Sequence, residues 1–173
     1  MIPPFDPETG LLPPHPDGFG YPCSAEDVRV RLVEDLGSTP WRVELFDGWR
    51  RLHAGIADLV PSARWWLWGC FVTSHAEPLW ADRQWVDCLV QIEVSDLPAP
   101  EARQDQLAAL VDTGWAQQLR VDLAVVYVYP TTHPGNLVSV EMLESKWRPR
   151  ATVNIADHEA MELVPAGFLE VVT

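Results

Sequence analysis

The sequence predicts an α+β fold in which a mixed β-sheet carries its helices mainly on one face, preceded by an extended proline-rich arm. Two long helical patterns flank segments with the composition of buried strands, and the first part of the chain is dense in proline and glycine. The chain has 173 residues, of which 47% are hydrophobic and 21% charged. That is enough for one domain with its own hydrophobic core.

The extended arm is predicted over residues 1–22, and residues 23–173 are expected to form a single domain. Proline fixes φ and removes an amide donor, so this segment should be neither helix nor strand. Phe5, Leu11 and Leu12 are its expected anchors on the domain.

Two helices are predicted after the arm. Ser24 is a typical N-cap for a short helix that ends near Gly37. Thr39 and Pro40 then begin a longer amphipathic helix that closes before Pro61. Its apolar positions recur about every 3.6 residues; they are Val43, Leu45, Phe46, Trp49, Leu52, Ile56 and Leu59.

Three buried strands are predicted at 64–73, 85–94 and 120–129, the last being the richest in β-branched and aromatic residues. The other expected elements are an irregular segment at 74–84, a helix at 101–118, a loop at 131–136 and short strands near 138–142, 151–155 and 168–172. Adjacent strands joined by an irregular segment favour a mixed sheet.

The charge and the aromatic content point toward a protein partner. A formal net charge of −13 repels phosphate backbones, so broad nucleic-acid binding is not expected. The acidity suits a basic partner or a mimic of nucleic-acid charge, while the plainer interpretation is a solubility surface. Nine tryptophans exceed what a core of this size buries, which favours an apolar surface patch of the kind found at interfaces.

The same sequence gives no indication of a membrane or an export route. The longest apolar run is far shorter than the roughly 20 residues of a membrane span. The start has no basic region followed by an apolar one, so a cytoplasmic location is expected. Cys23, Cys70 and Cys88 form no C-x-x-C pair, and buried structural thiols are the expected role of Cys70 and Cys88.

Four residues that matter below lie in the predicted strands. Gly69 and Cys70 come late in the strand at 64–73, Asp87 lies in the strand at 85–94, and Asp122 in the strand at 120–129. Nucleotidyl transfer needs carboxylates that hold divalent metals and a small-residue turn that seats the triphosphate. Two carboxylates at i and i+2 lie on one face of a strand, and a third can come from a neighbouring strand.

The chain resembles the small bacterial nucleotidyltransferase-fold proteins, which carry Gly-Ser at a strand end, Asp-x-Asp on the next strand and often a later Asp. One bacterial branch is similar over nearly the whole chain. The similar segments are Ile2-Pro3-Pro4-Phe5-Asp6, Gly10-Leu11-Leu12-Pro13-Pro14-His15, Phe71-Val72-Thr73 and Arg148-Pro149-Arg150-Ala151-Thr152-Val153. The resemblance implies a nucleotidyltransferase-like sheet and a place in toxin–antitoxin or defence-type loci.

The chain departs from that pattern at the metal-binding positions. It has Gly69-Cys70 where the family has Gly-Ser, and its Asp-x-Asp falls on either Trp80-Ala81-Asp82 or Trp85-Val86-Asp87. The second placement fits the strand better, and in both the first carboxylate is replaced by a tryptophan, which cannot ligate Mg²⁺. The resemblance thus implies a degenerate site formed by Gly69, Cys70, Asp87 and Asp122, in which Asp87 and Asp122 are the metal-ligand positions. Glu77 or Asp82 could replace the missing carboxylate.

Three functions are compatible with the sequence. The first is a catalytically impaired nucleotidyltransferase-like protein that acts as a protein-interaction module and needs no cofactor. The second is an active Mg²⁺-dependent enzyme that transfers a nucleotide from an NTP to a protein or RNA. The third is an acidic mimic of nucleic acid that blocks a DNA-binding protein.

Overall fold

The computed structural model describes residues 1–76, 84–141, 143, 152–157 and 160–172. The strands are β1 (Tyr21–Cys23), β2 (Arg64–Trp68), β3 (Val86–Glu93), β4 (Val121–Val128), β5 (Thr152–Asp157), β6 (Ala160–Pro165) and β7 (Leu169–Val171). The α-helices are α1 (Ala25–Arg29), α2 (Pro40–Leu59), α3 (Glu101–Leu110), α4 (Thr113–Gln118) and α5 (Gly135–Glu141). Shorter helical turns are η1 (Val30–Glu34), η2 (Gly69–Phe71) and η3 (Val94–Asp96).

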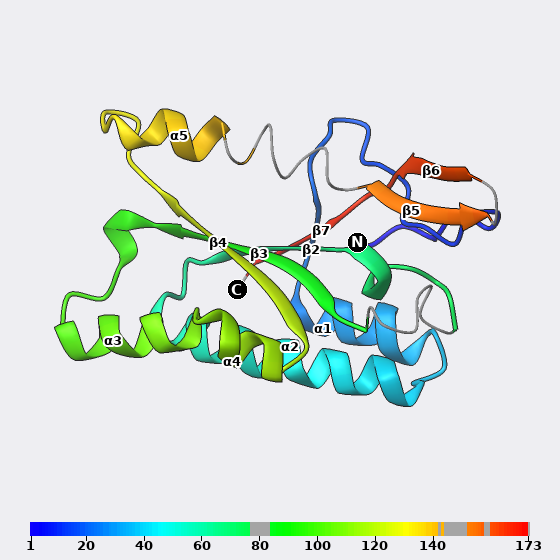
Figure 1. Cartoon of the computed structure of the whole chain (residues 1–173), viewed down its shortest axis with the longest axis horizontal. Coiled ribbons are helices and arrows are strands. Elements are labelled where there is room, and N and C mark those ends of the chain that lie inside the picture. Colours follow the sequence, from blue (N-terminus) through cyan, green and yellow to red (C-terminus); the bar gives the residue numbers. More distant parts are fainter. Residues whose placement is uncertain (77–83, 142, 144–151, 158–159, 173) are drawn as a thin grey trace.

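These elements form the predicted α+β fold with a mixed sheet. Five strands are ordered β1-β7-β2-β3-β4, and β5 and β6 make a separate antiparallel pair. Strand β3 runs antiparallel to β2 and parallel to β4. Helices α1 to α4 lie on one side of the five-stranded sheet, whereas α5 and the β5–β6 pair lie on the other (Figure 1). None of the helices in the described ranges is long and apolar enough to cross a membrane.

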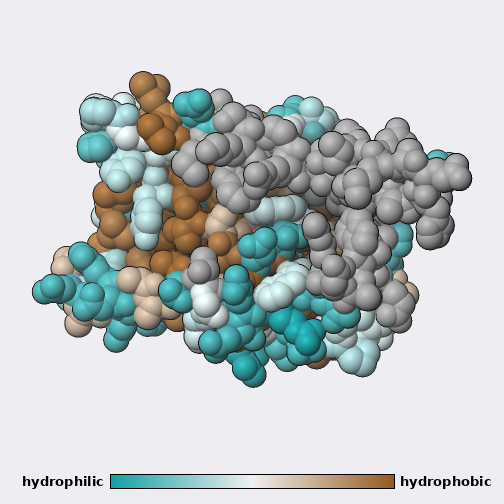
Figure 2. All heavy atoms as spheres, in the orientation of Figure 1, coloured by the Kyte–Doolittle hydropathy of each residue, from teal (hydrophilic) through white to brown (hydrophobic). Residues whose placement is uncertain are grey.

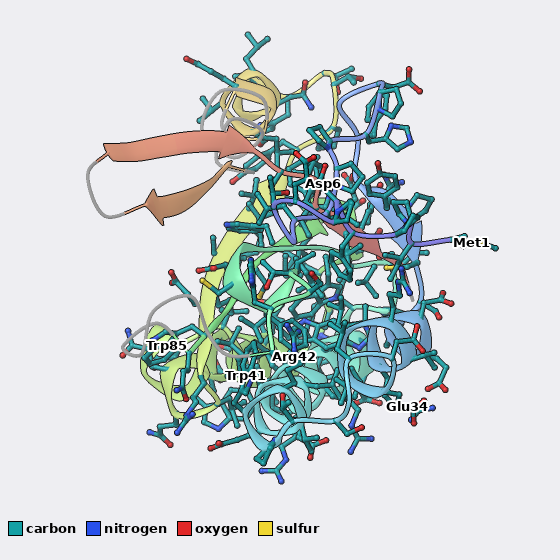
Figure 3. All side chains as sticks on the ribbon, turned by 90° about the vertical axis from the view of Figure 1, so that its right-hand side faces the viewer. Met1, Asp6, Glu34, Trp41, Arg42 and Trp85 are labelled. Atoms are coloured by element: carbon teal, nitrogen blue, oxygen red, sulfur yellow. The ribbon has the colours of Figure 1, made fainter. Side chains whose placement is uncertain are left out.

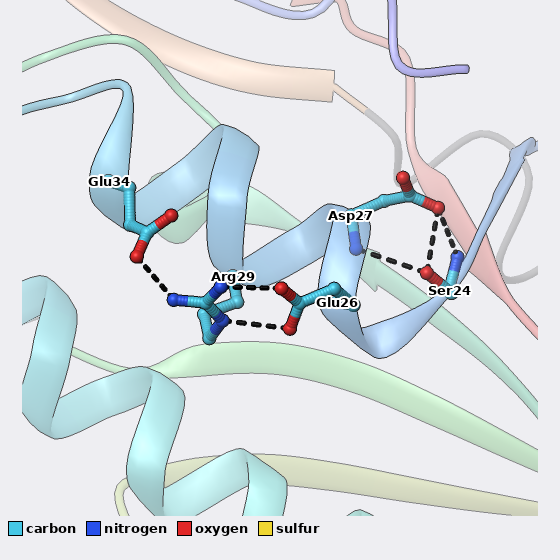
Figure 4. Close-up of polar contacts among 5 residues, drawn as sticks. All are labelled: Ser24, Glu26, Asp27, Arg29 and Glu34. Carbon is cyan, nitrogen blue, oxygen red and sulfur yellow. Dashed lines mark hydrogen bonds and ion pairs between the residues drawn. The ribbon is translucent and has the colours of Figure 1, made fainter.

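The first helix begins where the sequence predicts. The Ser24 hydroxyl accepts a hydrogen bond from the Asp27 amide at 3.1 Å, and the Asp27 carboxylate accepts one from the Ser24 amide at 2.8 Å, which is a complete capping box. Arg29 then bridges Glu26 and Glu34 along the outer surface (Figure 4). The π-helical η1 continues the element, and Gly37, at φ +85°, follows its end.

Helix α2 contributes many of the buried side chains on the helical side of the core. It begins at Pro40 and ends at Leu59, before Pro61, as predicted. Its buried side chains pack against the strand residues that point toward the helices, and on β3 these are Val86, Cys88, Val90 and Ile92. Gly48 lets the end of α4 approach closely, because a Cβ there would overlap the carbonyl oxygen of Leu119. The alternation of β3 leaves Asp87, Leu89 and Gln91 on the opposite face.

Three predicted elements differ from the structure, and a local feature explains the first two. The strand at 64–73 stops at Trp68, since Gly69 takes φ +77° and starts η2. The helix at 101–118 is two helices: the Asp112 carboxylate accepts hydrogen bonds from the amides of Gly114 and Trp115 and starts α4. The strand predicted at 138–142 is part of α5 in the described residues, and β6 was not predicted.

The N-terminal segment is tied to the domain at several points. Leu11 and Leu12 are buried, Phe5 packs partly against the core, and Leu11 forms an isolated bridge with Thr73. Residues Tyr21–Cys23 pair in parallel with β7, so the expectation that 1–22 contains no strand is wrong at its end. The division into an arm at 1–22 and a domain at 23–173 stays a prediction.

Candidate carboxylate site

Three residues on neighbouring strands form one row across an end of the sheet, which we call the carboxylate row: Trp68, Asp87 and Asp122. Trp68 is the register partner of Asp87 in the antiparallel β2–β3 pair, and Asp87 is the partner of Asp122 in the parallel β3–β4 pair. Register partners share a face, and neighbouring strands lie about 4.8 Å apart. The indole and the two carboxylates therefore stand side by side on the face opposite α2, with Asp122 exposed and Asp87 half-buried.

Gly69 completes the row on the β2 side. A Cβ on Gly69 would overlap Oδ2 of Asp87 and lie 2.8 Å from its Cγ, so the Asp87 carboxyl group packs directly against the glycine. Gly69 also has φ +77°, a conformation that side chains with a Cβ rarely adopt. The structure thus brings together three of the four predicted site residues: Gly69, Asp87 and Asp122.

The fourth predicted residue, Cys70, lies next to them in the chain but is buried, at 7% exposure. Its carbonyl accepts a hydrogen bond from the Thr73 hydroxyl at 2.9 Å, which tightens the turn. Cys88 follows Asp87 and is completely buried, and burial, followed by the nearby charges of Asp87 and Asp122, raises the pKa of its thiol. Cys70 and Cys88 are both buried, as predicted, and form no disulfide, and the raised pKa makes Cys88 a poor nucleophile.

Arg42 of α2 binds the backbone of the segment that follows η2, a role that the sequence did not predict. Its guanidinium donates to the carbonyls of Phe71 (3.0 Å), Thr73 (2.7 Å) and His75 (2.7 Å), and to that of Leu32 (3.1 Å). The side chain is fully buried between α2 and this segment (Figure 3), and burial lowers its pKa to about 10. An arginine on an amphipathic helix gives no sequence signal for such a role, because most arginines there face solvent.

The N-terminal segment also contacts the segment that follows η2. The Ser74 amide donates to the Gly10 carbonyl at 2.8 Å, and His75 Nε2 lies 3.1 Å from the Thr9 carbonyl oxygen. Gly10 has φ +68°, and a Cβ there would lie 2.8 Å from His75 Nε2. Together with Arg42, these contacts fix the backbone that follows the site.

The position expected to hold the first carboxylate is Trp85, two residues before Asp87. It is half-buried and, in Figure 3, lies on the side of the molecule opposite Asp6 and Met1. The alternation of an extended chain places residues two apart on one face. The alternative placement at Trp80–Asp82 and the possible replacement Glu77 lie outside the described residues.

Among the described residues, the carboxylate row has fewer oxygen ligands than a two-metal centre uses. Such a centre needs a carboxylate shared between the ions in addition to the others, and the row offers two carboxylates beside an indole. Among the residues that the structure describes, no group of three or more His, Cys, Asp or Glu side chains could hold a metal ion. Two carboxylates are instead suited to one weakly held hard cation or to an organic cation.

Two surface grooves of the described chain lie away from the carboxylate row. Two shallow grooves, each about 530 Å³, flank α2 on the helical side and share Val43 and Asp47 as lining residues. Their charged side chains are largely paired with one another, as in Arg29 with Glu26 and Arg120 with Glu44. These grooves are separate from the carboxylate row and add no group to it.

Comparison with known proteins gives a family but no characterised relative. No curated protein and no solved structure matches the chain. The DUF6932 family, described as a family of unknown function, matches residues 3–172, and the chain therefore belongs to this family.

Proposed function

We propose that this protein is a nucleotidyltransferase-like protein that does not transfer nucleotides and acts as an interaction module for a basic protein partner. The observation that carries the proposal is the carboxylate row, in which Asp87 and Asp122 are in register beside Gly69 while Trp85 stands two residues before Asp87. If the resemblance holds, Gly69 corresponds to the turn and Asp87 and Asp122 to two carboxylates of a nucleotidyltransferase site, with the indole of Trp85 in place of the remaining carboxylate.

The support for a protein partner comes from charge and exposure. The chain has a net charge of −13, and Asp122 is exposed at the edge of the sheet. Acidic surfaces steer the association of basic proteins, and aromatic anchors then supply affinity. The resemblance to small nucleotidyltransferases suggests that this partner is a toxic protein of a toxin–antitoxin or defence-type system.

The acidic-mimic hypothesis has less support. A mimic of nucleic acid presents a regular array of uncompensated negative charges. On the outer surface of α1 and η1, however, Glu26 and Glu34 are paired with Arg29, and Asp35 is paired with Arg31 at 3.2 Å. These ion pairs neutralise much of the negative charge there.

Isothermal titration calorimetry with Mg²⁺ and each of ATP, CTP, GTP and UTP tests the loss of catalysis. The wild-type protein is expected to give no binding heat. Trp85→Asp restores the carboxylate that the resemblance expects and should create Mg²⁺-dependent NTP binding. Trp85→Ala is the matched control, because it removes the indole without adding a ligand and should stay inactive. Adding Asp87→Asn to Trp85→Asp should abolish the gain.

The active-enzyme hypothesis predicts the opposite result. Mg²⁺-dependent NTP binding by the wild-type protein that is lost in Asp87→Asn and Asp122→Asn would establish the active-enzyme hypothesis instead. Glu77→Gln and Asp82→Asn would then show which of these residues supplies the third carboxylate. Co-expression with the product of the adjacent gene tests the partner: a stable complex supports the proposal, and two independently migrating proteins count against it.

A further inference from the structure

Strand β4 ends the five-stranded sheet in the described part of the chain, and its backbone groups can be assigned to the two sides of the strand. The Arg120 carbonyl accepts a hydrogen bond from the Val86 amide at 2.9 Å, and Val86 is the register partner of Val121. Successive backbone groups of a strand point to opposite sides. The even-numbered residues of β4 therefore bond to β3, and the odd-numbered residues direct their amides and carbonyls outward.

Helix α5 already closes one end of this outer edge. The Ser139 hydroxyl donates to the Tyr127 carbonyl at 2.8 Å, and the Asn136 side-chain amide donates to the Tyr129 carbonyl at 2.6 Å. Both acceptors are odd-numbered, which agrees with the assignment from Arg120. Among the described residues no comparable donor reaches the outward carbonyls of Val121, Leu123 and Val125. The open part of the edge is therefore residues 121–125.

The surroundings of this open edge are apolar on one side and acidic on the other. Leu123 and Val125 face the helices, whereas Asp122 and Ala124 face the side of the carboxylate row. Exposed apolar side chains continue the surface toward α5: Tyr127 (38% exposed), Leu137 (76%) and Val138 (59%). Figure 2 shows this apolar area over β4, between α5 and α3. Natural proteins usually cover or charge an edge of this kind, because it is a template for strand pairing.

We propose that residues 121–125 of β4 receive an extended strand of the basic partner, with a Lys or Arg side chain beside Asp122. The incoming residue would extend the row of Trp68, Asp87 and Asp122 by one strand, so that its cation lies one strand spacing from Asp122 and two from Asp87. Main-chain hydrogen bonds supply affinity in such strand addition, and alternate side chains supply specificity. This inference rests on the proposed interaction function and names its partner chemistry.

Charge also decides between this occupant and a second copy of the chain. A second copy brings another net charge of −13, and β4 itself has the sequence Val-Asp-Leu-Ala-Val-Val-Tyr-Val, with no basic residue. Self-pairing would therefore offer no cation to Asp122 and would be opposed by repulsion between the chains. A basic strand removes both difficulties.

The test uses a fluorescein-labelled peptide, acetyl-Thr-Val-Lys-Val-Lys-Val-Lys-Thr-amide, and the full-length protein in EDTA, with fluorescence anisotropy as the readout. The Lys peptide is expected to bind, and the peptide with Glu in place of Lys is not. Two further peptides are N-methylated on all valines or on all lysines, which blocks one edge of the peptide strand or the other. One of these should bind at least about tenfold more weakly, because it loses two or three hydrogen bonds. The identity of the weaker peptide gives the strand direction.

A matched pair of charge reversals locates the contact. Asp122→Lys should weaken binding of the Lys peptide about fivefold. Asp105→Lys makes the same change of net charge at an exposed position on α3 and should have little effect. Hydrogen exchange should show new protection at the outward amides of Leu123, Val125 and Tyr127 when the Lys peptide is present.

Several results would overturn the inference. Equal binding by the two N-methylated peptides, equal effects of the two charge reversals, or absence of protection at the outward amides would show that the peptide binds elsewhere. Absence of binding by the Lys peptide would contradict the docking site. Protection of these amides by self-association, seen without peptide in analytical ultracentrifugation, would assign the edge to a second copy. None of these outcomes depends on nucleotide binding, so calorimetry tests the proposed loss of catalysis independently.

Discussion

The two faces of the central sheet differ in the side chains that β3 presents on each of them. On the helical face, β3 presents Val86, Cys88, Val90 and Ile92, all fully buried against the core. On the opposite face the same strand presents Asp87 in register with Asp122, two like charges on adjacent strands. The helical face contributes stability through buried apolar area, whereas the carboxylate row costs some, because like charges directly opposite each other repel.

The residues around the carboxylate row fall into two groups: those that hold the backbone in place and those available for binding. Arg42, Gly69 and Gly10 hold the backbone around the row in a defined conformation, and each is buried or has a conformation that only glycine adopts easily. Asp122, by contrast, is exposed, and Trp85 is half-buried. Substitutions of the supporting residues should therefore change folding, and substitutions in the row should change binding. The following predictions test this division, from the largest expected effect on stability to the smallest.

Arg42→Met should have the largest effect. The variant leaves four carbonyls, those of Leu32, Phe71, Thr73 and His75, without their donor. Buried unsatisfied carbonyls are costly, so the free energy of unfolding in urea should fall by about 3 kcal/mol or more. Arg51→Met, on the exposed side of the same helix, should change it by less than about 0.5 kcal/mol. Equal effects of the two variants would show that Arg42 does not support the loop.

Gly69→Ala should come second. The new Cβ meets the Asp87 carboxylate, and the residue must keep φ near +77°. We expect a loss of about 2 kcal/mol or more in the free energy of unfolding. Gly37→Ala is the control for the backbone alone, because Gly37 has φ +85° and no atom within 4 Å of a built Cβ. It should cost about 1 kcal/mol.

A double-mutant cycle isolates the contact between Gly69 and Asp87. In an Asp87→Ala background, Gly69→Ala should cost no more than Gly37→Ala does, since the overlapping carboxylate is gone. An unchanged cost in that background would mean that the two residues do not pack together, and the geometry of the row would need revision.

Local signals in the sequence predicted the elements whose ends are set locally. Ser24 with Asp27 fixes the start of α1, and Thr39-Pro40 and Pro61 bound α2. The errors arise where distant contacts decide. Leu137 and Val138 suggest a strand, yet Ser139 bonds to Tyr127 of β4 and the segment is helical. Tyr21–Cys23 becomes a strand only because β7, from the other end of the chain, lies beside it.

The resemblance to nucleotidyltransferase-fold proteins singled out Gly69, Asp87 and Asp122, but no sequence feature indicated the residues that support them. The register of β3 with β4 brings the two carboxylates together. Trp68 was not singled out, because its position in the row depends on the β2–β3 register. Arg42 was missed because four carbonyl acceptors separated from it by 10 to 33 residues leave no local pattern.

A smaller change in stability is expected from pH, because the helical face of the sheet packs against a buried histidine. His53 is buried between Trp49 and Trp65, with ring centroids 5.0 and 5.2 Å away, and burial lowers its pKa below the ordinary value of 6.5. The unfolded chain then binds a proton more readily than the folded one, so stability is lost as pH falls below about 6.5, by at most about 1.4 kcal/mol per pH unit. Urea unfolding between pH 7.0 and 5.5 measures this slope.

His53→Leu should flatten that slope, because it removes the group that protonates on unfolding. His133→Gln alters an exposed histidine that stacks on Tyr129 and is the matched histidine variant for comparison. A slope that persists in His53→Leu would place the pH dependence in other groups.

The smallest effect should have the opposite sign. Asp122→Asn removes one of two like charges in register on an exposed side chain, so it should stabilise the protein by a few tenths of a kcal/mol. Asp105→Asn gives the same change of net charge on α3 and measures the general effect of acidity. The difference between the two should shrink as salt is raised from about 0.01 to 1 M, because salt screens the repulsion between exposed charges. A residue whose removal stabilises the fold is not there for folding. If Asp122→Asn instead destabilises the protein more than Asp105→Asn, the Asp122 carboxylate contributes to folding stability. The proposed division between a stabilising face and a binding face would then be wrong.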